Sequence, residues 1–176
     1  TNIGVLPQAS VYAKKNRILD NKEMTKINDN LSANAAQDFS VDNSTFYYTT
    51  DDGGEFSYLM SYTLASKEKK KVIEKSWDVS GSGFTSEGKY MIVYINEDGK
   101  NAIEILDTKT MKPIILPNFE GKSITSVGFS DDEKWVRLYV GGSNSPSDLY
   151  TYNLETKEQF KLTNVLNDAI DIEDLV

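Results

Sequence analysis

The sequence predicts an all-β fold made of repeated four-stranded antiparallel units, and three observations support this prediction. A short segment with phenylalanine in its second position recurs with a spacing of 45 residues, at Phe39, Phe84 and Phe129. A polar segment headed by leucine recurs four times, from Leu19, Leu64, Leu106 and Leu154. Helical periodicity is weak along most of the chain, so the repeat describes a unit built from strands.

Each phenylalanine segment leads into a pair of strands. Aromatic and β-branched residues, which favour strands, follow at residues 45–48, 90–94 and 135–140. Turn-forming residues come next, in two short turns at 51–54 and 96–99 and in a longer polar turn at 141–146. The strands that follow include residues 102–106 and 148–152.

Each leucine segment predicts a tight hairpin between two strands. Its residues are mostly polar, and a short strand follows it, as at residues 113–116 and 159–162. The third residue after each leucine is lysine, at a position where a positive φ is commonly needed. We therefore expect left-handed backbone at Lys22, Lys67, Lys109 and Lys157.

Four strands joined by hairpins in roughly 45 residues are the blade of a β-propeller. We expect complete blades at residues 35–78, 79–120 and 121–163. Residues 1–34 carry the back half of another blade, with strands at 10–13 and 19–27, so that residues 1–163 form about three and a half blades. Known propellers close with at least four blades, so an open arc with uncovered faces is predicted. Further blades on a longer parent chain, or other copies of this chain associating through the open blade edges, would cover those faces.

The composition excludes several functions. The chain has 19 basic and 27 acidic residues, a net charge of −8, no cysteine and no histidine. This charge, with no basic cluster beyond the solvated turn expected at residues 67–71, excludes nucleic acid as a partner. Without histidine and cysteine, the common catalytic triads, thiolate metal sites and disulfides are also excluded. No stretch reaches the ~18 apolar residues of a membrane span. We expect no catalytic, cofactor-binding or metal-binding residues, and no cofactor.

Three groups of residues suggest a site, and a structural role is preferred for each. The acid pairs Asp51–Asp52 and Asp131–Asp132 are adjacent in turns, whereas general acid–base carboxylates must face each other across a substrate. Residues 96–99 look like part of a calcium loop but lack the twelve-residue ligand spacing. The aromatic residues are expected to pack between blades more than to form a carbohydrate- or peptide-binding surface. They are Trp77, Trp135, Tyr47, Tyr48, Tyr58, Tyr62, Tyr90, Tyr94, Tyr139, Tyr150 and Tyr152.

The repeated motifs resemble the blades of two families. The motif Phe-Ser-x-Asp before an aromatic strand, with DLYTYNLET at residues 148–156 and FKLT at 160–163, is similar to both. One family is the propeller of prolyl oligopeptidases, dipeptidyl peptidases and acylaminoacyl peptidases, and the other is the periplasmic propeller of the Tol–Pal system. The resemblance covers residues 10–163. Residues 164–176 look like the linker that enters the catalytic α/β-hydrolase domain in the peptidase family, which favours the peptidases.

The peptidase resemblance implies a non-catalytic propeller that gates or positions peptide substrates for an α/β-hydrolase domain absent from this chain. Its implied partners are that domain and the peptides. The G-x-S-x-G nucleophile elbow of the family has no match here, and neither do the paired glutamates of some dipeptidyl peptidases. The alternative is a Tol-like or sensor-like propeller that binds protein partners as a scaffold. These relatives favour a periplasmic or secreted location over a cytoplasmic one.

Overall fold

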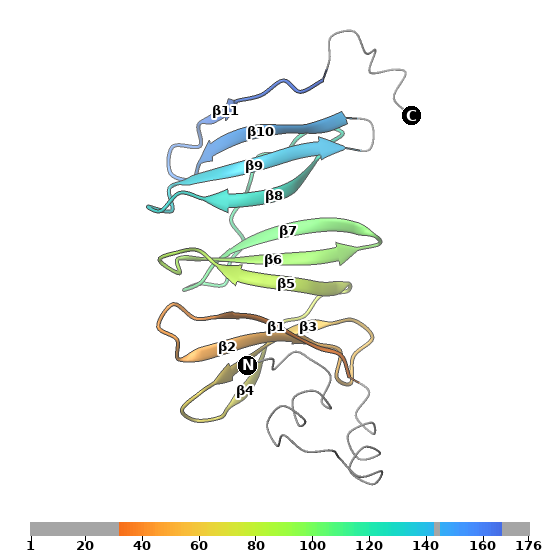
Figure 1. Cartoon of the computed structure of the whole chain (residues 1–176), viewed down its shortest axis with the longest axis vertical. Helices are drawn as coiled ribbons and strands as arrows, with labels where there is room; N and C mark the ends of the chain where they lie inside the picture. Colours follow the sequence, from red (N-terminus) through yellow and green to blue (C-terminus); the bar gives the residue numbers. More distant parts are fainter. Residues whose placement is uncertain (1–31, 143–144, 167–176) are drawn as a thin grey trace, which may run out of the picture.

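The computed structural model describes residues 32–142 and 145–166, and this part of the chain folds into three antiparallel sheets (Figure 1). The strands of the first sheet are β1 (Asn34–Phe39), β2 (Thr45–Thr50), β3 (Tyr58–Thr63) and β4 (Lys69–Ile73). The strands of the second sheet are β5 (Asp78–Phe84), β6 (Tyr90–Glu97) and β7 (Lys100–Asp107). The strands of the third sheet are β8 (Ser123–Phe129), β9 (Trp135–Gly142), β10 (Ser145–Asn153) and β11 (Gln159–Lys161).

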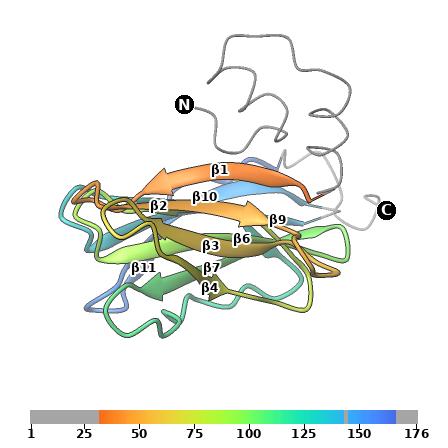
Figure 2. The ribbon, with the colours of Figure 1, turned by 90° about the horizontal axis from the view of Figure 1, so that it is seen from below.

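Each sheet is a meander in which strands adjacent in sequence are adjacent in space. The three sheets stack face to face along the long axis of the molecule, and the view from below shows their strands lying over one another (Figures 1 and 2). This arrangement confirms the all-β fold of consecutive propeller blades, which do not close into a ring. No helix in the described part of the chain is long and apolar enough to cross a membrane.

The phenylalanine segment forms the same turn in all three sheets. Ser40, Thr85 and Ser130 each donate their backbone N–H to the residue five positions later, at 2.8, 3.0 and 3.0 Å. Three residues after each of them, a positive φ closes the turn, at Asn43 (57°), Gly88 (70°) and Glu133 (55°). The 45-residue spacing is thus a spacing of hairpin turns.

The prediction for the lysines is correct at two positions and wrong at one. Lys67 and Lys157 have φ values of 60° and 64°, but in the middle sheet the positive φ of 55° belongs to Met111 and not to Lys109. The hairpin bonds explain the difference, because Met111 donates its N–H to the Asp107 carbonyl as Lys157 does to Asn153. The equivalent first residues are therefore Thr63, Asp107 and Asn153, and aligning Leu106 with the other leucines placed the turn two residues too early. Lys22 lies outside the described residues.

The middle sheet lacks the fourth strand expected at residues 113–116. Only a single bridge joins Leu106 to Pro113, with the Ile114 N–H donating to the Ile105 carbonyl at 2.7 Å. The chain then leaves the sheet, and Phe119 packs on Tyr150 of the third sheet with ring centroids 4.9 Å apart. Proline has no N–H to donate to a ladder, so Pro113 weakens this strand at its start. Strands β9 and β10 also run further than expected, into the stretch predicted as a long turn at 141–146.

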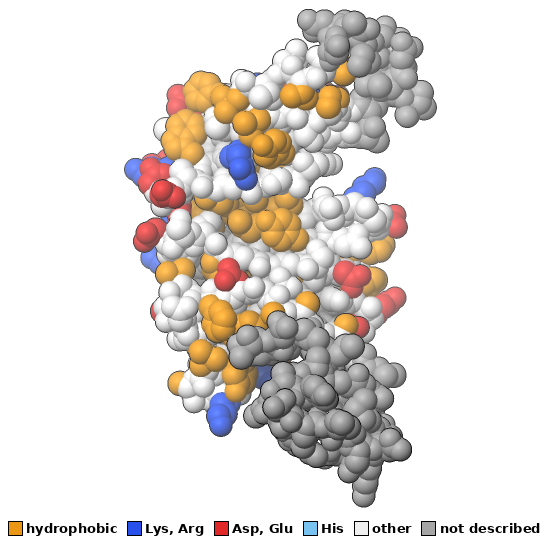
Figure 3. Space-filling model, viewed as in Figure 1, with side chains coloured by type: hydrophobic (Ala, Val, Ile, Leu, Met, Phe, Trp, Pro, Cys, Tyr) orange, Lys and Arg blue, Asp and Glu red, His pale blue; other side chains and the backbone are white. Residues whose placement is uncertain are grey.

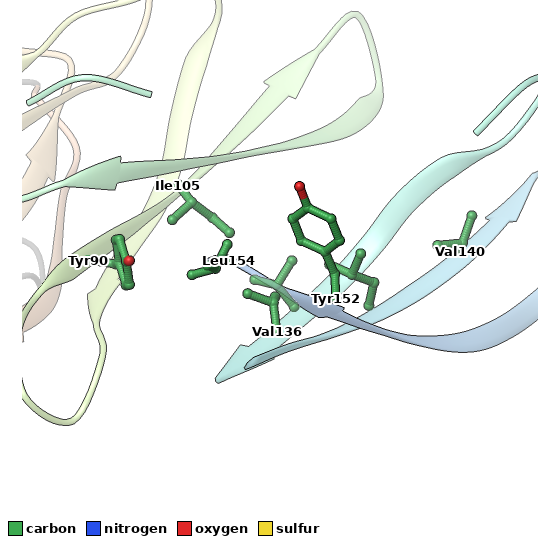
Figure 4. Close-up of a cluster of buried hydrophobic side chains, with 8 residues drawn as sticks. Tyr90, Ile105, Val136, Val140, Tyr152 and Leu154 are labelled. Atoms are coloured by element: carbon green, nitrogen blue, oxygen red, sulfur yellow. The ribbon is translucent and has the colours of Figure 1, made fainter. Parts of the chain in front are cut away.

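The core lies between the sheets, because the middle strands are buried on both faces. In β6, Met91, Val93 and Ile95 face the first sheet, while Tyr90 and Ile92 alternate with them and face the third. The larger cluster joins the second and third sheets through Tyr90, Ile105, Val127, Val136, Leu138, Val140, Tyr152 and Leu154 (Figure 4).

Several predictions lie partly or wholly outside the described residues. The strands expected at residues 10–13 and 19–27, and the end of the expected linker after residue 166, are among them. The described sheets span residues 34–73, 78–107 and 123–161. The division of the chain into blades at residues 35–78, 79–120 and 121–163 stays a prediction.

Candidate functional site: the uncovered face of the third sheet

One face of the third sheet has no neighbouring sheet in the described part of the chain. Along β9, Val136, Leu138 and Val140 point into the core and are fully buried, so Trp135 and Tyr139 point to the opposite side. Strand pairing places Phe160 and Leu162 on that side too, where they are 51% and 55% exposed. We call this surface the C-terminal face, defined by Trp135, Arg137, Tyr139, Phe160 and Leu162.

The equivalent face of each earlier sheet is covered by the next sheet. Tyr47 of the first sheet packs on Phe84 of the second with ring centroids 4.9 Å apart. Tyr90 of the second sheet packs on Phe129 of the third at 5.4 Å. Trp135, which is 45 residues after Tyr90, pairs among the described aromatic rings with Phe160 of its own sheet, at 6.2 Å. The C-terminal face therefore repeats a surface that serves elsewhere as a sheet-to-sheet interface.

A cation lies over one ring of this aromatic face. The Arg137 guanidinium carbon is 5.5 Å from the centre of the Tyr139 ring, which is a cation–π distance. The same side chain covers Gly128, where an added Cβ would lie 2.7 Å from an Arg137 terminal nitrogen. Trp, Tyr and Arg are the residues most enriched in protein–protein interfaces. The chemistry of the face suits packing and recognition.

Beside this face, a buried carboxylate fixes the path of the chain as it leaves the last sheet. Asp148 is 4% exposed, and one of its carboxylate oxygens lies 2.7 Å from the Lys161 ammonium. The other oxygen accepts hydrogen bonds from the Thr163 hydroxyl at 3.2 Å and the Val165 N–H at 3.0 Å. Burial opposes ionisation of this carboxyl, but the Lys161 ammonium and the hydrogen bonds outweigh it, so the pKa of Asp148 is lowered. Residues 161–165 are thereby held against β10.

Side-chain bonds to backbone join neighbouring sheets, and sequence reasoning missed them. The Ser82 N–H donates to the Gln37 side-chain oxygen at 3.1 Å, and the Phe84 N–H donates to the Asp38 carboxylate at 3.2 Å. Between the second and third sheets, the Glu87 N–H donates to Glu133, whose side chain is almost fully buried, at 2.7 Å. No motif signals these bonds, because each depends on how two sheets are placed relative to each other.

Each acid pair lies in a turn or loop that follows a strand. Asp132 accepts hydrogen bonds from the Ser130 hydroxyl at 2.6 Å and the Lys134 N–H at 3.2 Å, and Asp131 beside it is exposed. The Ser130 hydrogen bond is the main cause that lowers the pKa of Asp132. Asp51 accepts the Ala33 N–H at 2.6 Å. The Asp132 bonds stabilise a turn, and the Asp51 bond ties Ala33 to the loop that follows β2.

Of residues 96–99, the first two end strand β6, and Asp98 and Gly99 form the two-residue turn of the β6–β7 hairpin with positive φ. Among the residues that the structure describes, no group of three or more acidic side chains is placed to hold a metal ion. Most aromatic residues of interest pack between or within sheets, and Tyr48, Tyr58, Tyr90 and Tyr152 are buried. Trp77, Tyr94 and Tyr139 are exposed, at 36%, 37% and 37%, and the other aromatic residues of the set are half-buried.

Comparison with known proteins decides the family. Residues 8–165 match the family described as the N-terminal beta-propeller domain of prolyl oligopeptidase. The chain belongs to this family. No curated protein matches the chain.

Solved structures share the fold at low sequence identity. Prolyl oligopeptidase B from Galerina marginata is 17% identical over 81% of this chain and 21% of its own, with a TM-score of 0.60. A puromycin-hydrolyzing peptidase from Mycobacterium tuberculosis is 14% identical over 82% of this chain and 22% of its own, with a TM-score of 0.59. TolB from Acinetobacter baumannii is 20% identical over 74% of this chain and 32% of its own, with a TM-score of 0.53. The chain spans between a fifth and a third of the length of these proteins.

Proposed function

We propose that this chain is the non-catalytic propeller portion of a prolyl-oligopeptidase-family serine peptidase, and that it gates or positions peptide substrates for an α/β-hydrolase domain that lies outside it. The observation that carries the proposal is the match of residues 8–165 to the propeller of that family, in a sequence without a histidine to activate a serine. A propeller over an active site acts by restricting access and excluding water, which needs a rigid shape and no reactive group.

The C-terminal face and the fixed exit of the chain support a contact beyond residue 166. Asp148 holds the departing segment in one direction, so whatever follows or docks there meets the third sheet in a defined orientation. The hydrolase domain and the peptide substrates are the partners that we propose. Association with other copies through the C-terminal face is the competing use of the same surface.

Two measurements test this function. The purified chain should not hydrolyse fluorogenic peptides, and turnover abolished by a serine-directed inhibitor would contradict a non-catalytic role. The reading frame around the chain should encode a G-x-S-x-G elbow followed by Asp and His. That hydrolase domain, assayed with and without the propeller, should lose its preference for short peptides when the propeller is absent. Equal cleavage of long and short peptides by both forms would contradict gating.

A scaffold propeller is the second candidate, and the similarity to TolB favours it. Propellers have many unrelated functions, so the fold alone does not choose between a gate and a scaffold. In the scaffold case, the chain binds a protein partner through the C-terminal face. A reading frame without any hydrolase domain would support this candidate and would contradict the first.

A further inference from the structure

Among the described residues, the outer edge of the middle sheet has no strand partner at the place where its neighbours are paired. The hairpin bonds make Leu59, Ile103 and Leu149 equivalent residues of the three sheets. Leu59 pairs with Ile73 of β4, and the Leu149 carbonyl accepts the Leu162 N–H at 2.8 Å. No strand of the described residues pairs with Ile103 on its outer side.

The direction of these free groups follows from the strand register. Ile105 accepts the Ile114 N–H from outside the sheet, so its backbone groups point away from β6. Backbone groups alternate in direction along a strand, so those of Ile103 and Asn101 point outward as well. An unpaired row of N–H and C=O groups is a template for another extended chain. The empty stretch runs from Asn101 to the N–H of Ile105, whose carbonyl is already bound by Ile114.

A polar cleft of about 460 Å³ adjoins the start of this edge. Lys100 and Asn101 line it on the side of the second sheet, and Ser123, Thr125 and Ser147 line it on the side of the third. The surface is hollowed between these two sheets, on the side of the β6–β7 hairpin (Figure 3). No acidic side chain lines the cleft, although the chain carries 27 acidic residues.

The charges around the cleft favour an anionic group. In the described part of the chain, Lys100 forms no ion pair, even though Glu97 lies opposite it in the hairpin. Glu104 is the nearest acid along the strand, and it is already bound through both oxygens by Lys75, at 2.7 and 2.8 Å. The Lys75 ammonium therefore offsets the negative charge of Glu104, on the side of the first sheet.

We propose that the β7 edge binds an extended peptide, which adds as the fourth strand of the middle sheet and places a carboxylate at Lys100. The peptide continues the path of Lys112–Ile114 and so runs antiparallel to β7, with its C-terminal end at the cleft. Ile115, which is 84% exposed, contacts its N-terminal end. A second copy of this chain is a poorer occupant, because each copy carries a net charge of −8. The proposal goes beyond the gating function and does not depend on it.

The test uses the whole chain, labelled with ¹⁵N, and the probe acetyl-Val-Thr-Val-Asp with an amidated C-terminus. The amide signals of Asn101, Ile103 and Ile105 should shift on titration. A probe with asparagine in place of the aspartate, and a third that ends in asparagine with a free C-terminal carboxylate, distinguish a side-chain carboxylate from a terminal one. Lys100→Gln should remove the advantage of both charged probes over the neutral one, and Lys109→Gln, on an exposed turn, should not.

A matched pair of variants tests the backbone contact. Ile103→Pro removes the free N–H without touching the β6 ladder, which uses residues 102 and 104, and Ile103→Val keeps the N–H. Proline should weaken probe binding about five- to tenfold relative to valine, as expected for the loss of one hydrogen bond. If the proline variant fails to fold, methylation of the probe amide that faces the Ile103 carbonyl makes the same test.

Three results of the peptide titrations would overturn the proposal. They are shifts that map away from β7, equal binding by the two Ile103 variants or by the methylated and unmethylated probes, and no shift at millimolar peptide. Sedimentation that shows the free edge occupied by a second copy of the chain would also overturn it.

Discussion

The close approach of the first two sheets at one turn predicts a specific steric coupling. Gly88, in the turn before β6, has a φ of 70°, and an added Cβ would lie 2.6 Å from a Val41 methyl carbon of the first sheet. Gly99, in the β6–β7 hairpin, has nearly the same φ of 76° but no atom within 4 Å of an added Cβ. Alanine at Gly99 therefore measures the cost of a left-handed backbone alone, and alanine at Gly88 measures that cost together with the cost of a steric clash.

The expected magnitudes follow from these two terms. Gly99→Ala should lower the free energy of unfolding by roughly 1 kcal/mol, the cost of a left-handed alanine. Gly88→Ala should lower it by about 2 kcal/mol, because overpacking adds to the backbone term. Val41 is 53% exposed and can shift, which keeps the added cost near the lower end of its range. In a Val41→Ala background, Gly88→Ala should cost only about 1 kcal/mol, as Gly99→Ala does.

Equilibrium unfolding in urea, followed by tryptophan fluorescence, measures all four variants against the parent chain. The coupling between Val41 and Gly88 is the difference between the cost of Gly88→Ala in the two backgrounds. Equal costs would refute the steric reasoning and leave only the backbone conformation. A cost of Gly99→Ala near zero would refute the argument from φ.

Two further predictions concern a turn and the chain exit. Met111→Gly should raise the free energy of unfolding by about 0.5–1 kcal/mol, because glycine adopts a positive φ without strain. Lys109→Gly should lower it. Chemical unfolding that gives the reverse order would contradict the assigned position of the turn. In the folded chain the pKa of Asp148 is lowered below 3.8, the value expected in an unfolded chain. The ionised carboxylate therefore stabilises the fold fully above pH 3.8, and this stabilisation is lost as the pH falls through the lower pKa of the folded state. Asp148→Asn should flatten the dependence of stability on pH in this acid range and speed amide exchange at Val165, and an unchanged pH profile would show that the Lys161 pair contributes nothing.

Local turn chemistry explains which predictions from sequence were correct. The phenylalanine segment carries a serine or threonine and, three residues later, a residue at positive φ, so the sequence repeat and the structural repeat coincide. The leucine segment failed in the middle sheet because Asp107 sets the turn. Its carboxylate accepts the N–H groups of Lys109 and Thr110, as the side chain of Asn153 does in the third sheet. The residue whose side chain accepts the N–H groups of the turn marks the equivalent positions in these two sheets, and the leucine does not.

Competition between strand pairing and packing against other sheets explains the features that the sequence does not predict. Residues 113–116 have strand composition, yet they separate from β7 after Ile114, and Phe119 three residues beyond them is packed on Tyr150. At this point a few more backbone hydrogen bonds along the exposed β7 edge compete with packing of the Phe119 ring, and the packing contributes more to the stability of the fold. The free edge at Ile103 is the result. The hydrogen bonds that Gln37 and Asp38 accept from the second sheet likewise depend on how the two sheets are placed relative to each other.

At one central position the C-terminal face has a charged residue where the two internal interfaces have an uncharged one, and this limits what can cover it. The turns make Tyr47, Ile92 and Arg137 equivalent, and the first two pack against the following sheet. An arginine at this central position is stable in water but costly to bury without a partner. A covering blade or domain must therefore bring a carboxylate or a set of carbonyl groups to Arg137, in addition to an aromatic ring for Trp135. A propeller neighbour and a scaffold partner both have to meet this requirement, so the acidic group is the feature to look for in any segment proposed to complete the arc.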